Sequence, residues 1–348
     1  MEPSHLALFW AWVICGAIVL YTILDGFDLG VGVLFGTTRD ERLRVQMMNT
    51  IAPFWDGNET WLVVVGAGLF AAFPMVYAVF LSAFYLPVLL LLIGLIFRGI
   101  AFEFRFRARH ERVRQAWDLG FSLGATVVAF VQGAAVGAWL RGIPVVAGQY
   151  AGGAFGWLHP FTLLTGVGLV LGYALLGAGF LALRNQGELR DWAYRRIRGL
   201  AVGVLVVLLL AFTVTFDYSI VGRSGLEARP WGLVFPVVGL LALAAIIAGV
   251  HGRRDERPFV LTVVFFFAAF LTLAVMFWPY MIPYSITVAD AAAPDASLRF
   301  LFYGAIVVLP VVLAYTVGVY WIFRGKLGKV ETSADLSALH APGLERAH

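Results

Sequence analysis

The sequence predicts an all-α polytopic membrane protein, and three observations lead to that prediction. Hydrophobic residues make up 61% of the 348 residues, against about 45–50% in a typical globular domain. Charged residues make up only 13%, against about 25% in such a domain. The apolar runs are long enough to cross a bilayer as helices, which takes about 20 residues each, whereas a membrane β-barrel shows alternating segments of about ten residues. These observations exclude an ordinary soluble enzyme, a disordered chain and a disulfide-stapled secreted domain, the last also because Cys15 is the single cysteine.

We expect one membrane domain over residues 1–330, followed by a disordered cytoplasmic tail at 331–348 that is polar and rich in alanine. Residues 57–97 run almost without charge. As one helix they would extend about 60 Å, twice a hydrocarbon core of about 30 Å. We therefore expect them to fold back as a hairpin near Pro74. The resulting nine spans lie at about 8–34, 58–76, 78–99, 119–140, 160–183, 199–220, 231–250, 259–281 and 300–323.

The basic residues alternate between loops in the way that nine spans require. Cytoplasmic loops of membrane proteins carry an excess of Lys and Arg. Nineteen basic residues follow the odd-numbered spans and four lie in the other loops, whereas eight spans would put the first two basic clusters on opposite sides. We therefore expect the N-terminus outside and the C-terminus in the cytoplasm. The net charge of +4 then reflects topology, and nucleic-acid binding is not expected. The nineteen are Arg39, Arg42, Arg44, Arg105, Arg107, Arg109, Arg112, Arg114, Arg184, Arg190, Arg195, Arg196, Arg198, Arg253, Arg254, Arg257, Arg324, Lys326 and Lys329, and the four are Arg141, Arg223, Arg229 and Arg299.

Two carboxylates stand inside the first span, where lipid would surround them. An Asp near the middle of the membrane costs about 2.5–3.5 kcal/mol, so each needs a compensating role. Asp25 and Asp28 are three residues apart and share a helix face. Gly26 and Gly30 form a small-xxx-small pair that allows a neighbouring helix to come close. We expect Asp25 to mark a proton or ion route, while Asp28 is open to two interpretations: the same route, or a cap or ion pair with a loop arginine.

A second acidic motif opens the second span. Asp56 and Glu59 follow Trp55 in the first turns of the expected helix, where the helix dipole stabilises negative charge. Beyond that structural role, we expect Asp56 to be a proton-transfer residue, because it stands between an apolar setting and an arginine. The candidate arginine is Arg98, at the inner end of the third span. Its alternative role is that of an anchor whose charge reaches the membrane interface.

The histidines do not suggest a redox centre in this chain. None of the six lies near the middle of an expected span, and none forms a helical pair that could hold a metal or haem. Nucleotide-binding glycine motifs are also absent from the sequence. The residues alone thus predict a chain that moves protons or supports a partner that carries the chemistry.

The acidic motifs give the sequence a family resemblance. Residues 24–32, 51–61 and 68–74 resemble subunit 2 of cytochrome bd quinol oxidases. Phe97-Arg98 and residues 276–283 are similar to that family as well. The resemblance extends from residue 8 to about 323, and the motifs are long and unusual.

The resemblance implies an enzyme of the bacterial plasma (inner) membrane that oxidises quinol on the outer side and reduces dioxygen to water. It takes the protons from the cytoplasm, and is therefore electrogenic without pumping. Haems b and d and the quinol site belong to the partner, subunit 1, so this chain binds no haem or metal itself. The fold implied is two four-helix bundles plus one peripheral helix. Some family members hold a structural quinone, and small single-span subunits can join the complex.

For the site, the resemblance implies a cytoplasmic proton route through Asp25, Asp56 and Arg98. Four further residues share the motifs and are expected to support the route: Asp28, Trp55, Asn58 and Glu59. Two other functions remain open from the residues alone. Carboxylates within the membrane also occur in proton-coupled secondary transporters, and they can serve as ties between helices in a purely structural subunit.

Overall fold

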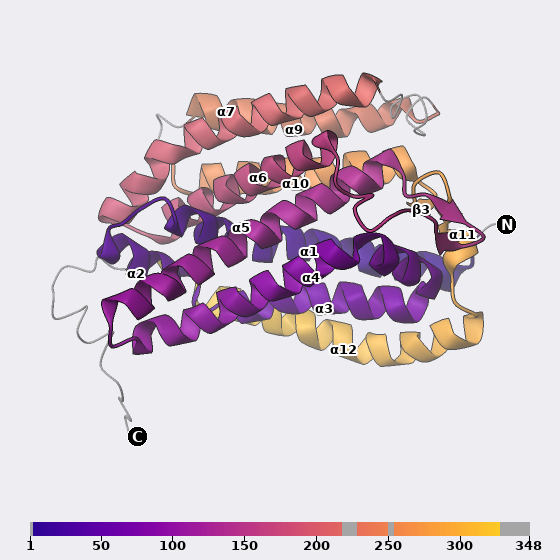
Figure 1. Ribbon diagram of the computed structural model, residues 1–348, viewed down its shortest axis with the longest axis horizontal. Helices are drawn as coiled ribbons and strands as arrows, with labels where there is room; N and C mark the ends of the chain where they lie inside the picture. Colours follow the sequence, from indigo (N-terminus) through magenta and orange to yellow (C-terminus); the bar gives the residue numbers. More distant parts are fainter. Residues whose placement is uncertain (1–2, 218–227, 250–253, 328–348) are drawn as a thin grey trace.

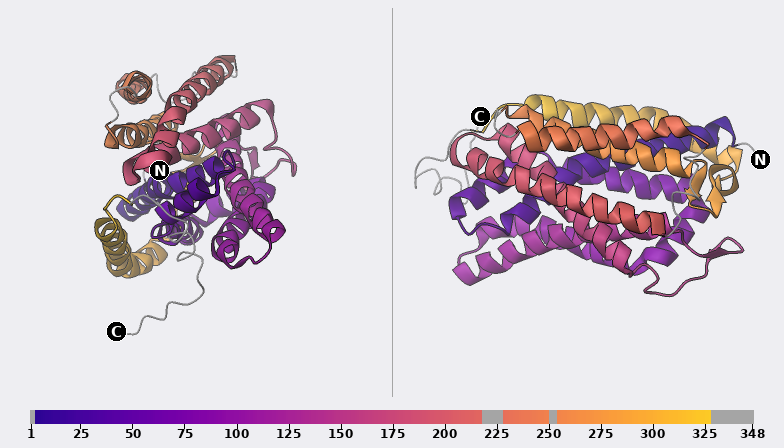
Figure 2. Two further views of the ribbon diagram at one scale, coloured as in Figure 1. Left: turned by 90° about the vertical axis from the view of Figure 1, so that its left-hand side faces the viewer. Right: turned by 90° about the horizontal axis from the view of Figure 1, so that it is seen from above.

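Long helices make up most of the computed structural model, which describes residues 3–217, 228–249 and 254–327. Figures 1 and 2 show that they run side by side along the long axis of the molecule. Within these ranges, nine helices have 16 residues or more: α1 (His5–Phe35), α3 (Trp55–Ala72), α4 (Pro74–Phe104), α5 (Glu111–Arg141), α6 (Pro160–Arg184), α7 (Gly187–Asp217), α9 (Val234–Gly249), α10 (Glu256–Phe277) and α12 (Asp295–Ile322).

Short elements join the long helices at both ends. At one end lie the helix α2 (Glu41–Ile51) and the 3-10 turn η1 (Arg105–Arg107). At the other end lie two small antiparallel hairpins, the short helix α11 (Val288–Ala291) and the 3-10 turn η2 (Pro230–Leu233). The hairpin strands are β1 (Val145–Val146), β2 (Gln149–Tyr150), β3 (Tyr280–Ile282) and β4 (Ile286–Thr287).

Eight of the described long helices are apolar and long enough to cross a membrane, which identifies a multi-pass membrane protein. The exception, α3, has 18 residues and carries Asp56, Asn58 and Glu59 in its first two turns, which lowers its hydropathy. It nevertheless lies beside α1, α4 and α12. The nine-span topology therefore remains a prediction.

The predicted break near Pro74 is confirmed. Helix α3 ends at Ala72, Phe73 has non-helical backbone angles, and Pro74 starts α4. Proline is tolerated at the first helical position because the amide hydrogen that it lacks has no partner there in any case. Within α4, Phe84 also leaves the helical region, one turn before Pro87, where a proline removes a helical hydrogen bond and clashes with the preceding turn.

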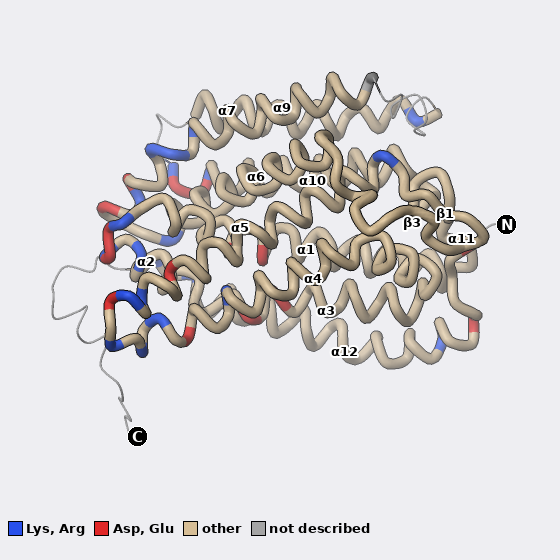
Figure 3. The backbone as a smooth tube through the Cα atoms, in the orientation of Figure 1, with Lys and Arg blue, Asp and Glu red and all other residues tan. Residues whose placement is uncertain are grey.

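Several helices are longer than the predicted spans. Helices α4, α5 and α7 each have 31 residues, or about 46 Å at 1.5 Å per residue, which exceeds the hydrocarbon core. Figure 3 shows that Lys and Arg gather at the end of the molecule opposite the N-terminus. The extra turns at this end, which we call the basic end, carry charged side chains while continuing the helix. The predicted sorting of basic residues is thus seen among the described residues, while Arg223, Arg253, Lys329 and the 331–348 tail lie outside them.

Helix α1 lies at the centre of the packing. It contacts α3, α5 and α6, while α4 packs on α5, α6 on α7, and α9 on α10. Helix α12 lies along one edge of the molecule against α3 and α1, and α7 and α9 lie along the opposite edge. The grouping into two four-helix bundles and a peripheral helix remains a prediction.

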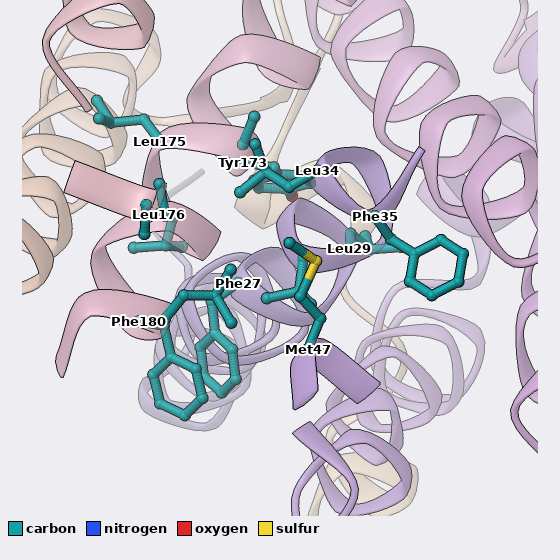
Figure 4. Close-up of a cluster of buried hydrophobic side chains, with 14 of the residues drawn as sticks. Phe27, Leu29, Leu34, Phe35, Met47, Tyr173, Leu175, Leu176 and Phe180 are labelled. Carbon is teal, nitrogen blue, oxygen red and sulfur yellow. The ribbon is translucent and has the colours of Figure 1, made fainter. Parts of the chain in front are cut away.

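Glycines bring α1 and α6 into direct backbone contact. A Cβ at Gly30 would overlap the backbone oxygen of Tyr173, and a Cβ at Gly26 would lie 2.8 Å from the Tyr173 ring. The expected close approach at Gly26 and Gly30 is therefore confirmed, and α6 is the helix that approaches. Nearby, the rings of Phe27 and Phe180 stack with centroids 3.9 Å apart, within the buried cluster of Figure 4.

Candidate functional site

A buried ion pair joins three of the long helices. Nη1 of Arg98 on α4 donates to Oδ1 of Asp25 on α1 at 2.7 Å, and Nη2 donates to Oε2 of Glu59 on α3 at 2.9 Å. The side chains of Asp25 and Arg98 are 0% and 2% exposed, whereas that of Glu59 is 30% exposed. The guanidinium therefore bridges a fully buried carboxylate and one that reaches the surface of the chain.

The charges of this set do not balance. One guanidinium neutralises one carboxylate, while Asp25 and Glu59 supply two, and Asp28 lies close enough to add its own electrostatic repulsion. A buried negative charge without compensation is unfavourable. Binding a proton to one of the carboxyl groups removes the excess charge, so the arrangement is chemically suited to take up and release a proton.

Position along the helices orders these groups from the basic end inward. Asp56 lies in the first turn of α3 and is exposed, and Glu59 follows one turn later. Asp25 lies ten residues before the end of α1, about 15 Å from that end at 1.5 Å per residue. Exposure thus falls from Asp56 through Glu59 to Asp25.

The expectation that Asp56 is the carboxylate beside Arg98 is wrong. Among the described residues, Arg98 forms its ion pairs with Asp25 and Glu59, and Asp56 has no ion pair. Asp56 is exposed rather than buried, although it lies close enough to Glu59 to interact with it electrostatically. Helical geometry explains the difference: residues three apart point in directions that differ by about 60°, and the rotation of α3 turns Glu59 toward α4.

Arg98 is a buried ion-pair residue, so the alternative of an interface anchor is contradicted. Trp55 covers the same region of α4, because its ring stacks on that of Phe102 with centroids 5.4 Å apart. Gly99 leaves room for this ring, since a Cβ there would lie 3.5 Å from it. The tryptophan therefore packs over the turn that follows Arg98.

The alternative that Asp28 pairs with a loop arginine is also contradicted. Asp28 is fully buried, and its Oδ2 accepts a hydrogen bond of 2.7 Å from Nδ2 of Asn58. The same amide donates to the Leu24 backbone oxygen at 3.2 Å, and its Oδ1 accepts from the Tyr320 hydroxyl at 2.9 Å. Asn58 therefore connects α12, α3 and α1, and Asp28 is held by an amide.

A second polar chain joins α5, α6 and α1. Nε2 of Gln132 on α5 donates to the Tyr21 hydroxyl at 2.6 Å, and the Tyr173 hydroxyl of α6 donates to Oε1 of Gln132 at 2.8 Å. Sequence reasoning missed these three residues and Tyr320. A signal existed, because Gln132 is an amide inside an otherwise apolar run.

At the basic end, ion pairs hold the short elements in place. The buried Arg105 contacts Asp118 of α5 and donates to both carboxylate oxygens of Glu41, while Arg44 pairs with Asp118 at 2.8 Å. A pair between Glu103 and Arg107, each two residues from Arg105 in the sequence, lies on the surface with 3.8 Å between Nη2 of Arg107 and Oε2 of Glu103. The Arg105 cluster thus ties α2 and η1 to α5, a structural role.

A second ion cluster at the basic end joins the later helices. Asp255, just before α10, pairs with Arg190 of α7 at 2.7 Å and with Lys326 beyond α12. Burial alone would raise the pKa of Asp255, but hydrogen bonds from Lys326 and Arg190 outweigh it and lower the pKa below the usual value. The contact fixes three segments that are distant in sequence.

The described residues contain no cluster of metal-ligating side chains. They contain no group of three His, Cys, Asp or Glu side chains that could hold a metal. Of the histidines, His5, His110 and His159 are described, and each lies at the start of a long helix, away from the buried core.

Comparison with known proteins decides the family. The family model for cytochrome bd terminal oxidase subunit II matches residues 6–323. The chain belongs to this family. It is 30% identical to cytochrome bd-I ubiquinol oxidase subunit 2 of Escherichia coli, over 94% of this chain and 97% of the relative. It is 31% identical to cytochrome bd ubiquinol oxidase subunit 2 of Bacillus subtilis, over 92% and 97%.

A solved structure agrees with the fold. The bd oxidase from Geobacillus thermodenitrificans matches with a TM-score of 0.74 at 16% identity, over 92% of this chain and 98% of that one. As a cytochrome bd subunit II, the chain is a component of an oxidoreductase complex and partners with subunit 1. The family membership also confirms the resemblance seen in the acidic motifs.

Proposed function

We propose that this chain is the haem-free subunit 2 of a cytochrome bd quinol oxidase, and that it supplies a cytoplasmic proton route to the haem-bearing subunit 1. The oxidase takes electrons from quinol and reduces dioxygen to water in the bacterial plasma membrane, electrogenically and without pumping. The observation that carries the proposal is the Asp25–Arg98–Glu59 set, which links a partly exposed carboxylate to a buried one inside apolar helices.

The basic end faces the cytoplasm in this proposal, and nine spans place the N-terminus outside. The excess of Lys and Arg at that end supports the orientation. Asp56 and Glu59 then lie where protons arrive, and Asp25 lies further into the membrane. The decreasing exposure from Asp56 to Asp25 supports the direction of transfer.

Each residue of the set plays a distinct part in the proposed route. Asp56 collects protons at the surface, and Glu59 passes them to Asp25. Arg98 stabilises the charged forms of Glu59 and Asp25, so that neither carboxyl group holds its proton permanently. Trp55 limits the access of water beside Arg98. Asn58 holds Asp28 and the neighbouring turn of α1 in register with α3.

The test uses the assembled oxidase with subunit 1. Asp25→Asn and Glu59→Gln each remove one proton site while keeping the size of the side chain. We expect retained haem, a large loss of quinol oxidase activity and slowed proton uptake from the cytoplasmic side. Glu103→Gln is the matched control, because it neutralises an exposed carboxylate at the same end.

Three results would contradict the proposal. Full activity and unchanged proton uptake in Asp25→Asn would exclude the route. Loss of haem in all the variants, with normal proton uptake in the fraction that assembles, would indicate a purely structural subunit. A colourless protein that never co-purifies with a haem-bearing partner would favour a transporter.

A further inference from the structure

Asp25 uses only one of its two carboxylate oxygens in the ion pair. Oδ1 accepts from Arg98, whereas Oδ2 is buried and has no hydrogen-bond partner among the described residues. An ionised carboxylate has only acceptor sites, and a donor that reaches them favours the charged form. The group that faces Oδ2 therefore affects how readily Asp25 holds a proton.

Tyr21 is the tyrosine beside Asp25 on α1. It lies one turn before Asp25 on α1, so the two side chains share a face. It is buried, and its hydroxyl interacts with the Asp25 carboxyl, although the contact is looser than a full hydrogen bond.

Gln132 determines where the Tyr21 hydrogen can point. The amide nitrogen of Gln132 donates to the Tyr21 oxygen at 2.6 Å, and an amide nitrogen cannot accept. The hydroxyl hydrogen of Tyr21 must therefore point to another acceptor. The Asp25 carboxylate, one turn away on the same face of α1, is the negatively charged acceptor beside it.

Tyr173 in turn fixes the orientation of the amide. Its hydroxyl donates to Oε1 of Gln132 at 2.8 Å, which leaves Nε2 for Tyr21. The position of Tyr173, which Figure 4 labels, follows from the close contact of α6 with Gly26 and Gly30 on α1. A reversed amide would take the Tyr21 hydrogen for itself and leave the carboxylate facing an oxygen atom, which is unfavourable while Asp25 is charged.

We propose that Tyr21, oriented by Gln132 and Tyr173, is a positioning residue that donates a hydrogen bond to Asp25 and stabilises its charged form. The inference rests on the proposed proton route and adds to it: the pH at which Asp25 binds a proton is then set by α5 and α6 as well as by Arg98. The chain Tyr173–Gln132–Tyr21 orients a hydrogen atom and does not itself transfer protons.

The other titratable groups around Asp25 remain in place when this chain is altered. They come from four helices, and each interacts electrostatically with Asp25 or with its ion pair. They are Arg98 of α4, Glu59 and Asp56 of α3, Asp28 of α1 and Tyr320 of α12. Tyr173 of α6 also interacts with Asp25 but is itself a member of the altered chain.

The experiment compares Tyr21→Phe, Gln132→Leu and Tyr173→Phe in the complete oxidase. Infrared difference spectra follow the carboxylic acid band of Asp25, identified by its loss in Asp25→Asn, as a function of pH. In Tyr21→Phe the hydrogen-bond donor is lost. We therefore expect the band of protonated Asp25 to persist to a pH about one to two units higher than in the wild type. The pH profile of proton uptake should move in the same direction, and the shift should be smaller for Tyr173→Phe, which acts through Gln132. Tyr303→Phe is the control, because that tyrosine is exposed on α12, and no shift is expected there.

The outcomes separate this inference from the proposed route. An Asp25 band with wild-type pH dependence in both Tyr21→Phe and Gln132→Leu would overturn the inference, even if Asp25→Asn blocks proton uptake. If Asp25→Asn leaves uptake intact while Tyr21→Phe shifts the band, the route fails and the hydrogen bond stands. Should Tyr21→Phe fail to assemble, the band shift in Gln132→Leu decides, because that residue does not touch Asp25.

Discussion

The guanidinium of Arg98 on α4 donates a 2.7 Å hydrogen bond to the carboxylate of Asp25 on α1, with both side chains almost wholly buried. Such a pair makes two opposing demands on the fold. Burying both charged groups away from water is unfavourable. Once they are buried, however, each charge is stabilised only by the other. Substituting one partner should therefore lower the stability of the complex far more than substituting both.

Arg98→Met tests that dependence. It leaves Asp25 without a counter-charge, and we expect a loss of about 3–5 kcal/mol in stability. The double variant Asp25→Asn, Arg98→Met should recover much of the loss, since the buried charge at position 25 is removed together with its partner and Glu59 reaches the surface of the chain. Thermal unfolding of the purified complex measures both. Arg107→Met is the control, because its pair with Glu103 is exposed and is worth about 0–1 kcal/mol. A double variant as unstable as Arg98→Met would contradict the argument.

Much of the fold follows from the sequence because its causes are local. Apolar runs, the proline at the start of α4 and the basic residues at one end are each visible without knowledge of the packing. Helix α2 was missed although its signals are present. Asp40 caps it by accepting from the backbone amides of Arg42 and Leu43, and Leu43 and Met47 recur at helical spacing.

The site was predicted less fully, because contacts between helices depend on their relative rotation. The sequence placed Asp25, Arg98 and two acidic residues of α3 near one another. It could not tell whether Asp56 or Glu59 faces α4, since that choice depends on how α3 packs on α1. Likewise, Gln132 and Tyr173 gain their importance only when α5 and α6 are seen to meet Tyr21.

Gly30→Ala should separate α1 from α6. The added Cβ would overlap the backbone oxygen of Tyr173, and a backbone cannot move aside as a flexible side chain can. Overpacking of this kind costs about 1–3 kcal/mol. We expect a lower unfolding temperature and, because Tyr173 moves with α6, a weakened contact with Gln132. Gly16→Ala is the matched control on the same helix, since a Cβ there meets nothing within 4 Å. Equal unfolding temperatures for the two variants would show that the contact is not tight.

Asp255 makes the stability of the basic end depend on pH. Its pKa is lowered in the folded protein, where burial is outweighed by hydrogen bonds from Lys326 and Arg190. A carboxyl group with a lowered folded pKa contributes stability that is present above its unfolded pKa of about 3.9 and is lost as the pH falls through the folded pKa.

Asp255→Asn should therefore be less stable than the wild type at pH 7, and the difference should shrink below about pH 4. Thermal unfolding in detergent across this range measures the difference. Glu256→Gln changes the neighbouring carboxylate while leaving the Arg190 and Lys326 contacts in place, and serves as the control. A stability difference that grows on acidification would have the wrong sign and would refute the assignment.

Asn58→Leu tests how far the stability of the protein depends on the hydrogen bond that Asn58 donates to the buried Asp28. Asn58 supplies a 2.7 Å hydrogen bond to Oδ2 of Asp28, and Oδ1 of that carboxyl has no partner among the described residues. Without the amide, a fully buried carboxyl group loses its donor, which costs about 1–3 kcal/mol or more. The link from Tyr320 on α12 is lost with it.

Asp28→Asn separates a structural role from one in proton transfer. It keeps an acceptor oxygen for Asn58 and removes the buried charge, so we expect it to be more stable than Asn58→Leu in the purified complex. If Asp28 serves only to hold α1 against α3, proton uptake in Asp28→Asn should match the wild type. A loss of uptake with retained haem would instead make Asp28 a second proton site beside Asp25, and would extend the route along the same face of α1.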